Sequence, residues 1–144
     1  MEPERYDDRV RGRQECDRWG VYVFGALDVP RRTNRCVFEG TARGEKIVGS
    51  PFDDFLDGKG GNDRLFGGAG ADTISGGQGA DRIVGGAGAD RIDGGRQRNV
   101  ILAGPGDDAV AVANGWRDIV DCGTGRDTVI ADSLDVLRHC EVRH

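Results

Sequence analysis

Residues 67–93 read GGAGADTIS, GGQGADRIV and GGAGADRID, which are three nearly identical units of nine residues. Counting outward in steps of nine gives consecutive units from Gly40 to Ala111. After Ala111 the register slips by about one residue, and the pattern then resumes as far as residue 130. Position eight of each regular unit is apolar: Ile47, Leu56, Leu65, Ile74, Ile83, Ile92, Ile101 and Val110. A fixed period of this kind predicts a repeat protein whose stacked units bury one continuous core.

Each unit combines a glycine-rich half with a short apolar half. Glycines at positions one, two and four allow the positive backbone angles of a tight turn and leave the carbonyl oxygens unshielded. Position six ends the turn with an acidic residue or its amide: Glu45, Asp54, Asp63, Asp72, Asp81, Asp90, Asn99 and Asp108. The residues that follow, such as RIV or TIS, suit a short strand with one inward apolar side chain. The unit therefore predicts a turn followed by a strand.

The composition of the whole chain agrees with a repeat architecture. Of the 144 residues 25 are glycine, and only 37% are hydrophobic. Such a chain either stays disordered or is built from units that each bury one apolar side chain. The net charge of −5 argues weakly against nucleic acid as a partner, since nucleic acid needs a basic surface. No apolar stretch approaches the roughly 20 residues of a membrane helix, and residues 1–15 lack the apolar core of a signal peptide.

The consensus GGxGxDxUx, in which U is apolar, resembles the calcium-binding nonapeptide repeat of the RTX (hemolysin-type) family. The resemblance covers residues 40–130 and is strongest from Gly58 to Gly95. It implies an all-β fold, a right-handed parallel β-roll (β-solenoid) in which two nine-residue units form one coil. We therefore expect an N-terminal capping segment (1–39), the calcium-binding β-roll (40–130) and a C-terminal cap (131–144).

In such a roll, units two apart in sequence become neighbours, so the acidic residues line two edges. Carboxylates about 5 Å apart repel by roughly 3 kcal/mol at an effective dielectric constant of about 20, before screening. The roll therefore needs a cation between successive turns. Calcium fits because it accepts many oxygen ligands in irregular geometry, whereas magnesium demands near-ideal octahedral geometry and keeps its water. Softer metals prefer His or Cys, which the turns lack.

We expect several calcium ions, held by carboxylates and by carbonyl oxygens of the turn glycines. The best predicted sites bridge Asp54 and Asp72, Asp72 and Asp90, Asp63 and Asp81, and Asp90 and Asp108. The predicted metal ligands are Asp54, Asp63, Asp72, Asp81, Asp90, Asp108, Gly67, Gly68, Gly70, Gly76, Gly77, Gly79, Gly85, Gly86 and Gly88. Departures from the consensus predict doubtful, weak or irregular binding at four further positions: Glu45, Asn99, Asp118 and Asp127.

The chain has four cysteines, and none forms a CxxC pair, which argues against a zinc site. An even number in a core-poor chain suggests two disulfides and an oxidising compartment. Three connectivities are possible. We favour Cys16–Cys36 with Cys122–Cys140, because each pair lies within one flanking region.

The sequence contains no GxSxG, HExxH or P-loop motif, so it predicts a binding protein rather than an enzyme. The leading hypothesis is a monomeric bacterial protein, secreted or at the cell surface, whose folding is coupled to calcium. One alternative is an accessory folding or secretion module of a larger RTX enzyme or toxin. Another is an adhesive or matrix protein. No residue pattern identifies a protein or carbohydrate partner.

Overall fold

The computed structural model of the protein describes residues 13–16, 36–140 and 142–143. Every regular element in these residues is a β-strand, and most strands are three residues long. In chain order they are β1 (Arg13–Cys16), β2 (Cys36–Glu39), β3 (Lys46–Val48), β4 (Phe55–Asp57), β5 (Arg64–Phe66), β6 (Thr73–Ser75), β7 (Arg82–Val84), β8 (Arg91–Asp93), β9 (Val100–Leu102), β10 (Ala109–Ala111), β11 (Ile119–Asp121), β12 (Thr128–Ile130), β13 (Val136–Arg138) and β14 (Val142–Arg143). No helix that could cross a membrane occurs in this part of the chain.

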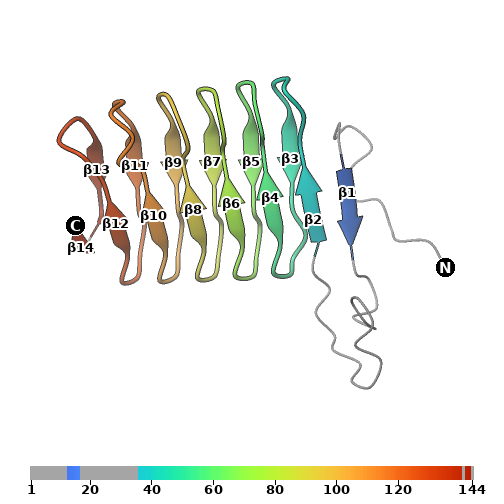
Figure 1. Cartoon of the computed structure of the whole chain (residues 1–144). Helices are drawn as coiled ribbons and strands as arrows, with labels where there is room; N and C mark the ends of the chain where they lie inside the picture. Colours follow the sequence, from blue (N-terminus) through green and yellow to red (C-terminus); the bar gives the residue numbers. More distant parts are fainter. Residues whose placement is uncertain (1–12, 17–35, 141, 144) are drawn as a thin grey trace, which may run out of the picture.

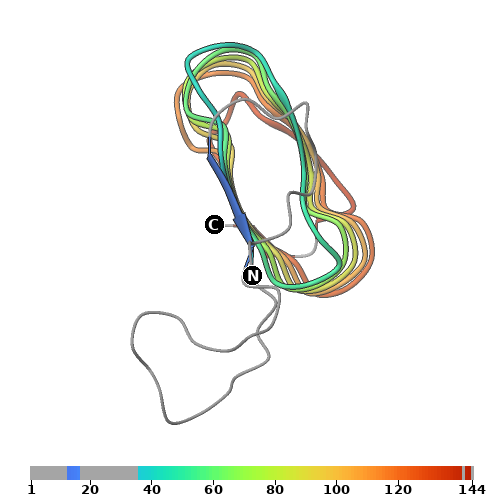
Figure 2. The ribbon, with the colours of Figure 1, turned by 90° about the vertical axis from the view of Figure 1, so that its right-hand side faces the viewer.

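The strands form two sheets that face each other across a stack of coils (Figure 1). One sheet has the order β1-β2-β4-β6-β8-β10-β12-β14, and the other has the order β13-β11-β9-β7-β5-β3. Seen along the stack, successive coils superimpose as one elongated ring (Figure 2). Leu65 pairs with Ile83 in parallel register, as Ile74 does with Ile92. The predicted all-β parallel β-roll is confirmed.

The register slip is also present in the structure. Across the slip Ile101 pairs with Val120, and Val110 pairs with Val129, so these coils are one residue longer than the regular ones. Both sheets remain parallel through the longer coils. The extra residue therefore lies in the turns, where it does not disturb the strands.

The core follows position eight of the repeat, as predicted. All of these apolar residues are buried, and none exposes more than 3% of its surface. Position one adds a second buried row toward the C-terminus, where Ala103, Val112 and Cys122 replace the usual glycine and join the core. The glycine consensus gave no indication of this row, because a glycine has no side chain to bury.

The parallel ladder reaches into both predicted flanks. Phe38 of β2 is fully buried and pairs with Leu56 of β4, so the apolar ladder begins before Gly40. At the other end β13 and β14 continue the two sheets. The predicted flanks thus contribute strands to the two sheets of the roll.

Strand β1 pairs antiparallel with β2 and lies outside the parallel ladder at its N-terminal end (Figure 1). An added strand of this kind pairs the backbone groups that an edge strand would otherwise expose. The register sets Cys16 opposite Cys36. The side chains of both cysteines lie outside the described part of the structure, so a Cys16–Cys36 disulfide stays a prediction.

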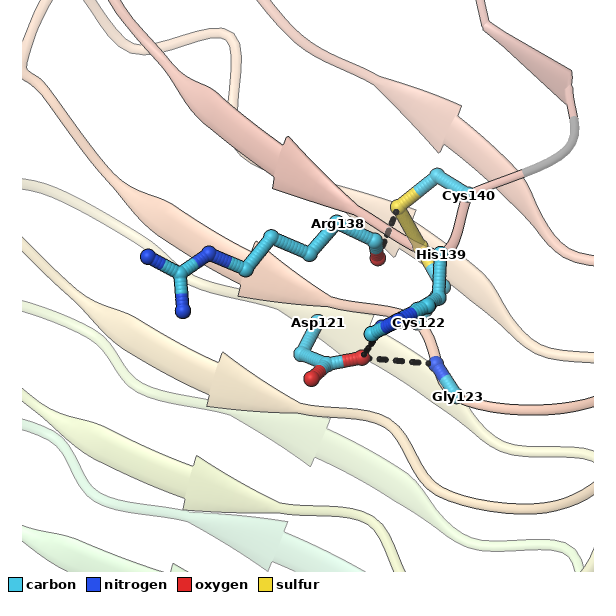
Figure 3. A network of polar contacts seen from close by, with 6 residues as sticks. All are labelled: Asp121, Cys122, Gly123, Arg138, His139 and Cys140. Atoms are coloured by element: carbon cyan, nitrogen blue, oxygen red, sulfur yellow. Dashed lines mark hydrogen bonds and ion pairs between the residues drawn. A yellow bond between two sulfur atoms is a disulfide. The ribbon is translucent and has the colours of Figure 1, made fainter.

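The predicted Cys122–Cys140 disulfide is present at the C-terminal end. It ties the turn after β11 to the turn after β13, and Figure 3 shows the polar contacts beside it. Asp121 Oδ1 accepts a hydrogen bond from the Gly123 N–H at 3.1 Å and lies 2.9 Å from Nδ1 of His139. The disulfide links the last two coils of the roll covalently. A bridge that closes a loop of this length stabilises the fold by about 3 kcal/mol in the chain-entropy model.

Candidate metal centre

The position-six side chains line two edges of the roll, as the repeat predicts. We call the edge whose turns lead into β4, β6, β8, β10 and β12 the first edge, and the edge whose turns lead into β3, β5, β7, β9 and β11 the second edge. Along the first edge the N–H of Asp54 donates to Asp72 Oδ1, that of Asp72 to Asp90 Oδ1, and that of Asp90 to Asp108 Oδ1, at 2.8–2.9 Å. Along the second edge the N–H of Asp63 donates in the same way to Asp81. Each carboxylate is therefore fixed by the backbone one coil earlier.

The second oxygen of these carboxylates is the unusual feature of the site. It is buried and accepts no hydrogen bond in the central turns. The residues with such an Oδ2 atom include Asp63, Asp72, Asp81, Asp90 and Asp108. A buried carboxylate oxygen without a partner is costly. Two rows of such oxygens indicate that a positively charged group belongs between the turns.

Burial gives these carboxyl groups unusually high pKa values. Desolvation is the largest cause, and hydrogen bonds from the backbone oppose it only in part. The charges of Asp54 and Asp90 add to the effect at Asp72, whose pKa rises to about 8. The pKa rises to about 7 at Asp63, Asp81 and Asp90, and to about 6 at Asp108 and Asp118. Without a cation, the carboxyl groups whose pKa is about 7 or higher are therefore partly protonated at neutral pH.

The metal-free roll is accordingly expected to lose stability as pH rises. The folded chain binds protons more tightly than the unfolded chain, so their stabilising effect is complete below the ordinary pKa of 3.8 and is lost as pH rises through about 6 to about 8. Urea unfolding of chelator-treated protein at acidic and at mildly alkaline pH measures this slope. If the stability of the metal-free roll increased over this pH range, the raised pKa values of the buried carboxyl groups would be contradicted.

Glycine is favoured at positions two and four of the central turns because the coils approach closely there. Gly77 and Gly79 have positive φ angles. A Cβ atom on either one would overlap a carbonyl oxygen of the preceding coil, that of Lys59 or of Gly61. The predicted ligands Gly68, Gly70, Gly86 and Gly88 face carbonyl oxygens in the same way. The carbonyls at positions two and four of one turn therefore point at the next turn.

Glycine at position one makes room for the carboxylate of its own turn. A Cβ atom on Gly67 would lie 2.6 Å from Asp72 Oδ2, and one on Gly76 would lie 2.7 Å from Asp81 Oδ2. Gly85 stands in the same relation to Asp90. The position-one glycines thus allow the unpartnered oxygens to sit inside the turn.

The atoms available to a cation are all oxygens. In the part of the chain that the structure describes, no three His, Cys, Asp or Glu side chains converge on one point. A metal ion would therefore take one or two carboxylates and several backbone carbonyls. That donor set suits calcium, which accepts carboxylate and carbonyl oxygens in flexible geometry, and it does not suit softer ions.

The acids near the ends of the stack differ from those in the centre. Both carboxylate oxygens of Asp54 accept hydrogen bonds from Ser50, at 2.6 Å from its N–H and 2.6 Å from its hydroxyl. Thr41 satisfies Glu45 in the same way. These donors stand at position two of their units. Because the consensus has glycine at position two, these donors were not predicted from the sequence.

Two amides replace the pattern on the second edge toward the C-terminus. The Asn99 side chain accepts from the Asp81 N–H like an aspartate, but its Nδ2 donates to the Gln97 carbonyl at 3.1 Å. Asn114 Nδ2 donates to Asp118 Oδ2 at 2.8 Å. Weak binding was predicted at Asn99 and irregular binding at Asp118, and at both positions an amide group already donates to oxygens of the turn.

Comparison with protein families gives a match to the RTX calcium-binding nonapeptide repeat, in four copies. The matched segments are residues 39–74, 48–83 and 75–110, which together span half of the chain. No curated protein and no solved structure matches this chain. Repeat period, stacked coils and family match agree, and the chain belongs to the family of RTX calcium-binding nonapeptide repeats.

Proposed function

We propose that this protein binds several calcium ions between successive turns of the roll, and that binding completes its folding outside the cell or at the cell surface. The observation that carries the proposal is the two rows of buried carboxylate oxygens without hydrogen-bond partners. Each central turn with such an oxygen also faces carbonyl oxygens of the preceding turn on the same edge. The family match supports calcium as the ion.

Asp72, Asp90 and Asp108 would hold calcium on the first edge, and Asp63 and Asp81 on the second, together with the carbonyls of positions two and four. Bound calcium supplies the positive charge that these acids need in order to ionise while buried. Asp54, which Ser50 engages on both oxygens, is the least favoured of the predicted ligands. The acids are spread singly along the edges, an arrangement that suits ion binding rather than catalysis.

A site of this kind couples metal binding to pH and to compartment. The carboxyl groups must lose their protons when the ion binds, so affinity increases as pH rises. Extracellular calcium modules bind at about 10⁻⁴–10⁻³ M. At that affinity the low calcium of the cytosol would leave the central turns unfilled, and export would allow them to fill. The disulfide Cys122–Cys140 supports an oxidising destination.

A calcium titration followed by far-UV circular dichroism tests the proposal. We expect chelator-treated protein to keep part of its β-sheet signal and to gain the rest cooperatively, with a midpoint at about 10⁻⁴–10⁻³ M calcium. Magnesium is the control, and it should not replace calcium at equal concentration. A full signal in chelator that calcium leaves unchanged would contradict coupled folding. Complete folding at sub-micromolar calcium would contradict the extracellular role.

A further inference from the structure

We propose that a position-two side chain that donates to the acid of its own turn makes that turn independent of an ion, and that the Asn114 amide takes the place of calcium between the turns 94–99 and 113–118. This inference rests on the proposed calcium function. It assigns the ions to the central turns and makes turns near both ends of the stack independent of calcium. The donors that carry it are Thr41, Ser50 and Asn114, each four residues before the acid of its turn.

The Asn114 side chain bridges the two turns. Its Nδ2 donates to the Gly95 carbonyl at 2.7 Å and to Asp118 Oδ2 at 2.8 Å, and it lies 3.4 Å from the Gln97 carbonyl. The orientation of the amide is fixed from the other side, since Asn114 Oδ1 accepts a hydrogen bond from the Trp116 N–H at 2.7 Å. The NH₂ group therefore faces three oxygens.

These three oxygens correspond to the ones that a central turn leaves for a cation. Gly95 and Gln97 occupy positions two and four of their unit, and Asp118 ends the next turn on the same edge. Two coils earlier on the same edge, the corresponding oxygens are the carbonyls of Lys59 and Gly61, which face turn 76–81, and Oδ2 of Asp81, which ends that turn. Asp81 Oδ2 has no partner, whereas Asp118 Oδ2 has the Asn114 amide.

Side-chain donors at position two also satisfy the acids at the N-terminal end of the stack. The hydroxyl groups of Ser50 and Thr41 donate to Asp54 at 2.6 Å and to Glu45 at 2.9 Å. These acids end the first turns of the two edges. In the units that end their turns with Asp72, Asp81, Asp90 and Asp108, position two is glycine, which offers no side-chain donor, and the acid keeps a buried oxygen without a partner. Position two of the Asp63 unit is Lys59, whose Nζ lies 3.4 Å from Asp57 instead, and Asp63 also keeps such an oxygen. A position-two side chain that donates to the acid of its own turn therefore removes the unpartnered oxygen of that turn.

Asn114→Asp is the sharpest test, because it replaces the NH₂ donor by an oxygen of nearly the same size. The variant should require a cation among four oxygens and bind one more calcium ion per chain than the wild type, measured by equilibrium dialysis. In chelator, hydrogen exchange should be faster around β9 and β11 in the variant. Asn114→Gly, which restores the regular residue of position two, should gain the same ion and serves if the aspartate variant does not fold.

Asn62→Asp is the matched control on the same edge. Asn62 accepts the Ala80 N–H through Oδ1, and Asp53 and Asp107 already play this part at the same position of other units. The control carries the same change of charge and should bind as many ions as the wild type. An unchanged ion count in both Asn114 variants would overturn this inference. A wild type that binds no calcium would contradict the proposed function instead, so the two failures are distinguishable.

Discussion

Asp90→Asn is expected to lower the free energy of unfolding in calcium by about 3 kcal/mol, when the ion is present at about 100 times its dissociation constant. The loss arises because one oxygen ligand of a central site becomes an amide. The fold itself tolerates the change: the Asn99 side chain accepts the backbone N–H one coil earlier at 2.9 Å, the same distance as for Asp90. In chelator the variant should be as stable as the wild type or more stable, since it no longer buries a carboxylate.

Asp93→Asn is the control for this prediction. It makes the same chemical change three residues further along, at an exposed side chain whose Oδ1 accepts the Gly95 N–H at 3.0 Å. Urea unfolding in calcium and in chelator gives both stabilities for each variant. If Asp90→Asn destabilised the protein equally in both solutions, the role of Asp90 would be structural and the site would not bind calcium there.

The fold could be predicted because every coil repeats the same pattern of residues. A turn that needs glycine, an acid that ends it and one inward apolar residue recur with a single period, so Leu65 and Ile83 had to stack once the coil length was known. The slip after Ala111 was visible in the sequence for the same reason. The structure accommodates it in the turns and keeps Val110 paired with Val129.

The ends of the roll were harder to predict, because the repeat is least regular there. Phe38 extends the apolar ladder, but no glycine-rich turn marks its unit in the sequence. The roles of Ser50 and Asn114 depend on where single donor atoms point, and a consensus does not specify this. The apolar residues between 17 and 35 that could form an N-terminal cap lie outside the described residues, and that cap stays a prediction.

Ile83→Ala is expected to cost about 2–5 kcal/mol of stability in saturating calcium. Ile83 is fully buried, and in β7 it pairs with Leu65 on one side and Ile101 on the other. The hydrogen-bonded register of both neighbouring strands limits how far they can shift to fill the cavity. Each strand offers only one inward apolar residue, so no second side chain of β7 compensates for the loss.

The same substitution should also raise the calcium concentration at which the roll folds, because the apolar ladder and the ion sites stabilise the same coils. Ile130→Ala is the matched control, since Ile130 is 51% exposed and an exposed truncation of this kind changes stability by less than about 0.5 kcal/mol. Urea unfolding and calcium titration of both variants measure the two effects. A folding midpoint that stays constant while stability falls would mean that the core and the ion sites form independently. A shift of the midpoint in Ile83→Ala alone would show that burial of the apolar ladder and binding of the ions are one cooperative process.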